Sequence, residues 1–272
     1  VCQTLLDSAL VPLGMPNRIW AISAIHADAT RLAALHDALY PRLAAGDRIV
    51  YLGNYGGYGL RTRETLDELL SFRRSVLALP SVIARDVIYL RGQQEEMWQK
   101  LLQLQFAPNP LPVLLWMLQN GLSETLCAWG FDPSDAIMAA QEGTMGLTRW
   151  NARMREFFRR VPGHDLFMNH LGRAAYTTER AGAPLLFVHA GIDPSKPLAR
   201  QGDSFWWAGA NFNAVEQPFK PFRKVVRGYD PAHNGMRLNC VTATLDGGCG
   251  FGGSLVCAGF DKGGEVFEIL EV

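Results

Sequence analysis

Between residues 18 and 92, three short apolar segments alternate with two longer amphipathic ones. The apolar segments are rich in Ile, Val, Leu and Tyr, and each ends at a polar or glycine-rich turn, which is typical of buried strands. The amphipathic segments carry apolar residues at helical spacing. The order predicts an α/β unit, with strands at 18–25, 47–53 and 85–92 and helices at 26–46 and 63–80.

An α/β unit carries its functional loops at the carboxyl ends of its strands. The turn after the second strand, GNYGGYG at residues 53–59, has four glycines in seven positions and no charged residue. It therefore combines the backbone of a reactive loop with none of the side chains that acid–base chemistry requires.

Residues 95–180 follow a different pattern. Their apolar positions have helical spacing, so we expect a helical insertion that covers one face of the molecule. Segments of strand type return from residue 183. The last three, between residues 235 and 272, are joined by short glycine-rich turns, which predicts an antiparallel meander. We expect a single domain over residues 1–272.

Composition limits the classes of function. The formal net charge is zero and the isoelectric point is about 7.1, which argues against a dedicated nucleic-acid-binding protein. The five cysteines include no pair at CxxC spacing, so neither a disulfide framework nor structural zinc is expected. We find no apolar run long enough for a membrane span and no signal peptide, and we expect a cytoplasmic protein.

Four strand ends follow one another along the chain: AISAIHAD, YLGNYGGYG, YLRGQQEE and LFVHAGIDP, with VVRGYDP later. In order and distance they resemble the signature loops of the calcineurin-like metallophosphoesterases, above all those of bacterial serine/threonine protein phosphatases of the PPP type. The patterns of that family are GDxHG, GDxxDRG, GNHE, HAG or HGG, and a later GHTP-like segment. The resemblance extends from about Arg18 to about Phe260.

This resemblance implies an α/β fold with a central β-sandwich flanked by helices, in four α/β/β/α layers with a helical insertion. It also implies the hydrolysis of phosphoesters with two divalent metals such as Mn²⁺. Carboxylates and imidazoles hold the two ions in such a centre, and the ions activate a bridging water. A nearby histidine protonates the leaving group, and arginines hold the phosphate.

The resemblance assigns six metal ligands to positions that this chain mostly fills with other residues. Only His26 and His189 are the family's residues. The aspartate of the first loop falls at Ala24, which has no donor atom. The bridging aspartate falls at Asn54, whose amide lacks the negative charge that two cations require. Other residues also hold the two remaining ligand positions: Gln93 and Tyr229.

The groups that would act on the phosphate are replaced as well. The proton-donating histidine falls at Gln94, which cannot titrate, and its aspartate partner falls at Gly57. The two phosphate-binding arginines fall at Tyr58 and Gly209, and a histidine two residues before the last ligand falls at Arg227.

These replacements predict a pseudophosphatase with no catalytic residue, no bound metal and no other cofactor, in which His26 and His189 are vestigial ligands. We expect it to act as a structural or regulatory subunit that binds a protein partner. The candidate surfaces are the degenerate pocket and the helical insertion, whose tryptophans are of the type that favours interface hot spots.

Two alternatives remain open. The chain could be a residual phosphoester hydrolase that uses His26, His189 and migrated ligands, for which the candidates are Asp28, Glu95, Glu96, Asp193 and His233. The resemblance gives Glu95 a structural role, and Asp28 is equally a candidate helix cap. Alternatively, the chain could be a sensor in which Arg227 and the amides of the glycine-rich loops bind an anion or a nucleotide.

Overall fold

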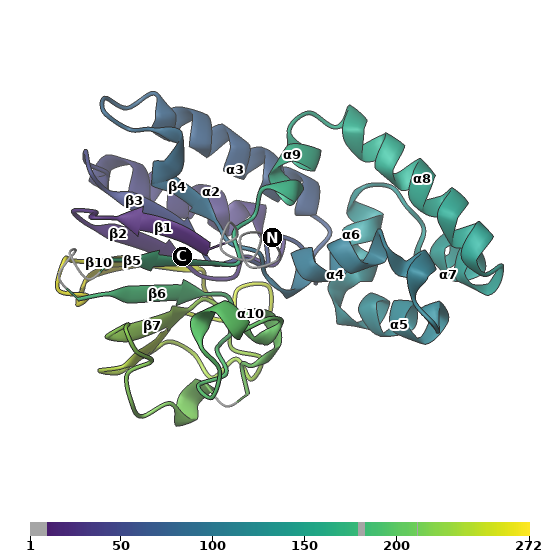
Figure 1. Cartoon of the computed structure of the whole chain (residues 1–272). Coiled ribbons are helices and arrows are strands. Elements are labelled where there is room, and N and C mark those ends of the chain that lie inside the picture. The colour runs from purple at the N-terminus through teal and green to yellow at the C-terminus, as the bar shows by residue number, and fades with distance from the viewer. Residues whose placement is uncertain (1–9, 179–182, 211) are drawn as a thin grey trace.

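Two β-sheets packed face to face form the centre of the molecule, and helices cover their outer faces (Figure 1). The computed structural model describes residues 10–178, 183–210 and 212–272. One sheet has five strands in the order β11-β10-β2-β3-β4, and the other has six in the order β1-β5-β6-β7-β9-β8. The predicted four-layer α/β fold is confirmed.

The five-stranded sheet contains the predicted α/β unit. Its parallel strands are β2 (Ile19–Ile22), β3 (Arg48–Tyr51) and β4 (Val87–Tyr89), linked by helices α2 (Ala29–Leu39) and α3 (Thr62–Leu77). Helix α2 ends before the predicted stop at Gly46, because a 3₁₀ turn over Tyr40–Arg42 follows it and Pro41 has no N–H to continue the α-helix.

The six-stranded sheet combines distant parts of the chain. Its strands are β1 (Leu10–Gly14), β5 (Ala174–Thr177), β6 (Leu185–Val188), β7 (Lys224–Arg227), β8 (Arg237–Leu238) and β9 (Thr242–Thr244). Strand β1 is absent from the sequence-based prediction. It is short and pairs with β5, whose sequence lies more than 150 residues away.

The predicted meander is wrong. Strand β9 pairs with β7 and β8 in the six-stranded sheet, whereas β10 (Val256–Phe260) and β11 (Val266–Glu271) form a hairpin in the other sheet. The glycine-rich segment 245–255 carries the chain from one sheet to the other. The local pattern of apolar residues identifies strands, but it does not say which of two stacked sheets a strand joins.

Helices follow one another from Gln93 to Asn169, and Figure 1 shows the middle ones, in teal, standing beside the sandwich. They are α4 (Gln93–Leu101), α5 (Pro110–Met117), α6 (Ser123–Ala128), α7 (Pro133–Gln141), α8 (Thr144–Arg160) and α9 (His164–Asn169). The insertion expected at 95–180 is thus shorter, and β5 occupies part of that range. None of the described helices has the length and apolar character of a membrane span.

Successive side chains along each strand point to opposite faces of the five-stranded sheet, and apolar cores lie on both faces. Ala21 and Val50 point between the sheets and meet Phe187 of β6. Their neighbours Trp20 and Ile49 point the other way, into the core beneath α2 and α3. Both faces of β2 and β3 are therefore covered, which explains their continuous apolar sequences.

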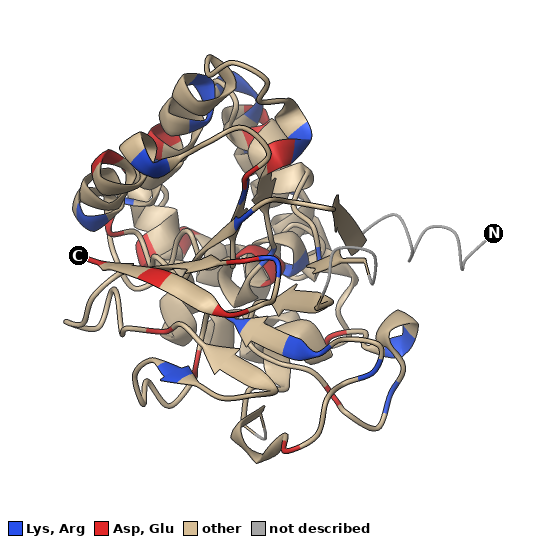
Figure 2. Cartoon of the chain, turned by 90° about the vertical axis from the view of Figure 1, so that its left-hand side faces the viewer, with Lys and Arg blue, Asp and Glu red and all other residues tan. Residues whose placement is uncertain are grey.

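Charged residues of both signs are interspersed over the face shown in Figure 2. Two ion pairs bridge distant segments of the chain: Arg42 binds Glu268 at 2.7 Å, and Arg223 binds Glu265 at 2.7 Å. The mixture of signs in this view does not resemble the single-sign charge that attracts nucleic acid.

The core between the sheets provides a test of the fold. Phe187→Ala should lower the free energy of unfolding by about 3–5 kcal/mol, because the fully buried ring lies edge-on to Phe260 with centroids 5.8 Å apart. Phe106→Ala is the matched control, since that ring is 79% exposed. Urea denaturation measures both, and equal losses would contradict the sandwich core.

Candidate functional site

The loops singled out in the sequence meet at one end of the sandwich. The backbone N–H of His26 donates to the carbonyl of Asn54 at 2.8 Å, which joins the loops after β2 and β3. The N–H of Ala24 donates to the carbonyl of Gly228 at 3.0 Å, and the N–H of Gly228 donates to the carbonyl of His189 at 3.0 Å. These bonds tie the ends of four strands from both sheets into one site.

Backbone strain is concentrated in this site. The described residues include six non-glycine residues with positive φ, and five of them lie in its loops: His26, Ala27, Asn54, Tyr58 and His233. The left-handed conformation costs such residues roughly 1–2 kcal/mol each. Strain of this kind persists only where the surroundings hold the backbone in place.

Glu95 is the group that holds two of these loops. Its carboxylate is 2% exposed and accepts hydrogen bonds from the backbone N–H groups of Asn54 (2.9 Å), Tyr55 (2.8 Å) and Gly92 (2.8 Å). Burial raises the pKa of Glu95, and the three N–H donors oppose that shift. These contacts agree with the structural role that the resemblance implied for Glu95.

His26 and His189, which the resemblance assigned as vestigial ligands, are buried neutral imidazoles. Burial lowers the pKa of His26 to about 3 and that of His189 to about 4. Nδ1 of His189 donates to the carbonyl of Leu52 at 2.7 Å, so Nε2 carries a lone pair, and that atom has no partner among the described residues. Nδ1 of His26 is likewise buried without one.

Two positions to which the resemblance assigned metal ligands lie in apolar contact. Ala24 and Tyr229 pack with Ala190 in a small buried cluster. The ring of Tyr229 also stacks on His189, with centroids 5.2 Å apart and planes within 9°. Burial raises the pKa of Tyr229, so its phenol stays neutral.

The side chains at two further positions that the resemblance assigned to ligands, Asn54 and Gln93, form hydrogen bonds within the protein. Asn54 accepts a hydrogen bond from the N–H of Gln94 at 3.0 Å, which directs its amide nitrogen toward Nε2 of His26 at 3.4 Å. Gln93 donates from its side chain to the carbonyl of Trp206 at 2.7 Å. Across the described residues, no three His, Cys, Asp or Glu side chains are grouped so that they could hold a metal ion. This donor set does not fit a pair of divalent cations.

Gln94 and Gly57, the positions that the resemblance assigned to the catalytic acid and its partner, are packed against each other. Its side chain donates to the carbonyl of Asn120 at 2.8 Å and lies across Gly57 and Gly121. A Cβ at Gly57 would be 2.2 Å from Cδ of Gln94, so an aspartate at position 57 cannot coexist with this conformation of Gln94.

Arg227 does not face the site as an anion-binding group. It is fully buried, and its guanidinium donates four hydrogen bonds: to Thr244 Oγ1 (2.9 Å), the carbonyls of Ala190 (3.3 Å) and Gly209 (2.9 Å) and Asn213 Oδ1 (3.2 Å). It also forms an ion pair with Asp230 at 3.2 Å. The alternative in which Arg227 binds an anion or a nucleotide is therefore wrong. Gly209 has no room for an arginine either, because a Cβ there would lie 2.8 Å from Pro231.

The candidate migrated ligands have other partners. Asp28 caps α2, accepting from the N–H of Arg31 at 3.0 Å, as the helix-cap interpretation predicted. The carboxylates of Glu96 and Asp193 form ion pairs with neighbouring cations: Arg91 at 3.1 Å and Lys196 at 2.8 Å. The ring of His233 lies beside the site, 5.5 Å from the ring of Tyr229. Its Nδ1, however, lies 3.1 Å from a carboxylate oxygen of Asp246.

Sequence reasoning missed Phe251. Its ring packs against those of His233 (4.1 Å), Tyr58 (4.8 Å) and His26 (5.1 Å) and closes the site with apolar contacts. The sequence does single out this residue, because Phe251 is the only large side chain in the segment GGCGFGGS.

Three solved structures with a similar arrangement of elements carry phosphatase names. A protein assigned as a diadenosine tetraphosphatase aligns over 97% of this chain and 97% of its own, with a TM-score of 0.56 and 17% identity. A serine/threonine phosphatase from Saccharomyces cerevisiae aligns over 94% of this chain and 79% of its own (TM-score 0.51, 13% identity). A cold-active protein tyrosine phosphatase aligns over 96% and 80% (TM-score 0.50, 10% identity).

The chain has the metallophosphoesterase fold. No protein-family model matches the sequence, and no curated protein is significantly similar to it. The likeness therefore lies in the fold. Within this metallophosphoesterase fold, the strand-end loops are held by Glu95 and by backbone hydrogen bonds, and neutral side chains fill the space between them.

The contribution of the contact between Gln94 and Gly57 to stability can be measured by comparing two glycines with the same backbone conformation. Gly57 and Gly130 both have φ +81°, but a Cβ at Gly130 meets nothing within 4 Å. Both alanine variants should lose roughly 1–2 kcal/mol through backbone strain. Gly57→Ala should lose more, because of the clash, and adding Gln94→Ala should remove the excess. Denaturation curves that show equal losses for Gly57→Ala and Gly130→Ala would contradict the close packing.

The two buried histidines of the site, His26 and His189, predict a dependence of stability on pH. Their folded pKa values of about 3 and about 4 lie below the value of roughly 6.5 expected in the unfolded chain, which therefore binds more protons below neutrality. Stability should fall by about 2 kcal/mol per histidine between pH 7 and pH 5. His189→Gln should flatten this slope, and His170→Gln, at an exposed position, should not. A slope that both variants leave unchanged would mean that His189 is not buried neutral.

Proposed function

We propose that this protein is a catalytically inactive homologue of PPP-type phosphatases that acts as a structural or regulatory subunit by binding another protein. The contact between Ala24 and Tyr229 carries the first half of the proposal, because two ligand positions are occupied by a packed apolar pair. Neutral imidazoles without a free carboxylate beside them have little affinity for a pair of divalent cations.

The helical segment supports the binding role. Helix α5 carries no charge and has apolar residues on all sides, although only Leu114 and Met117 are buried. A helix of that composition is normally covered on every side. Between Lys100 and Asp132 the sequence contains a single charged residue, Glu124. Depletion of charge together with exposed apolar side chains is the composition of an interface core.

Two tryptophans lie at the centre of this surface. Trp116 of α5 is 45% exposed, Trp207 of α10 (Ser204–Trp207) is 41% exposed, and their ring centroids are 5.6 Å apart. They join the helical segment to a helix that packs on the six-stranded sheet. Paired, partly exposed tryptophans are typical anchors of protein interfaces.

The loss of catalysis is tested by metal analysis of the purified protein, together with hydrolysis of a generic phosphoester in the presence of Mn²⁺. We expect less than one divalent ion per chain and no hydrolysis above the level of His189→Ala. Two bound ions per chain, or hydrolysis that falls in His189→Ala, would establish the residual hydrolase instead.

The binding role is tested by copurification from the native source. We expect a stoichiometric protein partner that remains bound to His26→Ala and His189→Ala but is lost from Trp116→Glu. Met15→Glu is the control, because Met15 is 68% exposed and lies outside this surface. A partner lost equally from Met15→Glu and Trp116→Glu, or no partner at all, would contradict the proposal.

A further inference from the structure

A second, separate pocket lies at the edge of β4. Its volume is about 560 Å³, within the range of roughly 300–1,000 Å³ that is typical of small-molecule sites. Its walls are mostly apolar, and their apolar side chains include Leu70 of α3, Ile88 of β4, and Leu166 and Phe167 of α9. None of the residues of the candidate site lines it.

The two charged side chains that line this pocket, Arg73 and Arg85, are both basic, and its other titratable groups are the imidazole of His170 and the phenol of Tyr89. Within the described chain, no carboxylate forms an ion pair with Arg73 or Arg85. The nearest in sequence, Asp86, is already paired with Arg48 at 3.0 Å. The pocket therefore combines an apolar interior with positive charge that no acidic side chain neutralises.

Arg73 is held in place for this role. Its two Nη atoms donate to the carbonyls of Val87 and Ala84, both at 3.0 Å, and its guanidinium lies 5.8 Å from the ring centroid of Tyr89. Carbonyl oxygens fix its orientation without cancelling its charge. The guanidinium of Arg85 has no hydrogen-bond partner among the described residues, so its five donors remain available.

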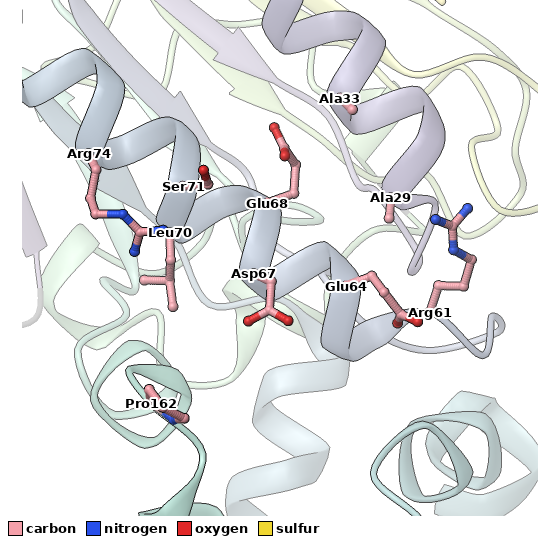
Figure 3. A pocket seen from close by; sticks show the side chains of 10 residues that line it. All are labelled: Ala29, Ala33, Arg61, Glu64, Asp67, Glu68, Leu70, Ser71, Arg74 and Pro162. Carbon is pink, nitrogen blue, oxygen red and sulfur yellow. The ribbon is translucent and has the colours of Figure 1, made fainter.

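A neighbouring hollow differs from this pocket in the charge of its lining (Figure 3). It lies between α2 and α3 and is lined by acids and bases together: Glu64, Asp67 and Glu68 with Arg61 and Arg74. Two of these acids already contact buried histidines, since Glu68 binds His36 and Asp67 binds His164. Its mixed charge selects no ligand class, whereas the pocket at β4 presents one sign.

We propose that the pocket at β4 binds a small amphipathic anion. The apolar body of the ligand lies against Leu70, Leu166 and Phe167, and its carboxylate or phosphate head group is bound by Arg73 and Arg85. Arginine suits such head groups because its planar fork donates two parallel hydrogen bonds.

The edge of β4 is not free for an added peptide strand, which favours a small ligand over a peptide. The carbonyl of Val87 accepts from Arg73 at 3.0 Å, and the carbonyl of Tyr89 accepts from the N–H of Gly172 at 2.9 Å. A strand that pairs with a sheet edge needs such main-chain acceptors. Recognition here rests on the side chains instead.

The test is calorimetric titration of the full chain with ten-carbon probes, below their micelle concentrations: decanoate, decyl phosphate, decanol and decyltrimethylammonium. We expect decanoate or decyl phosphate to bind at least about tenfold more tightly than decanol, and the cationic probe not to bind. The stronger of the two anions identifies the head group. Equal binding of the anions and decanol, or no binding of either anion, would overturn the proposal.

Two variants locate the binding. Arg85→Gln removes an exposed charge that has no ion pair, and Leu166→Asp adds a carboxylate at a side chain that is 65% exposed, so neither disturbs the core. Each should weaken binding of the anion about tenfold, while Arg74→Gln, in the neighbouring hollow, should not. Anion binding that either Arg85→Gln or Leu166→Asp leaves unchanged would overturn the assignment.

Discussion

The buried carboxylate of Glu95 determines the shape of the loop end of this protein. It accepts three backbone hydrogen bonds, at 2.8–2.9 Å, from the loops after β3 and β4. The carboxylate thereby joins the two loops through hydrogen bonds. The cost of burying the carboxylate is offset by N–H donors that would otherwise lack partners. The left-handed backbone of Asn54 and the position of Gln94 both follow from this bond set.

The side chains of the site fit one another. Gln94 occupies the space above Gly57, Tyr229 packs on Ala24 and His189, and Pro231 takes the volume beside Gly209. The result is a close-packed site in which His26 and His189 are neutral.

The proposed binding surfaces lie on different parts of the molecule. The uncharged surface of α5 and Trp207 lies where the helical segment meets α10, whereas the basic pocket lies between α3, α9 and the edge of β4. Both involve the helices between Gln93 and Asn169, which stand beside the sandwich in Figure 1. A fold whose catalytic loops are fixed can thus keep other surfaces available for binding.

The sequence by itself determined the α/β unit and the positions of the site loops. Periodicity and turn residues are local properties, so they are visible without the structure. Only the tertiary structure decided that β9 and β10 lie in different sheets, that β1 pairs with β5, that Arg227 is buried against carbonyl groups and Asp230, and that Phe251 packs over the site. Those outcomes depend on contacts between residues far apart in the chain, where the direction of a side chain is set by what packs against it.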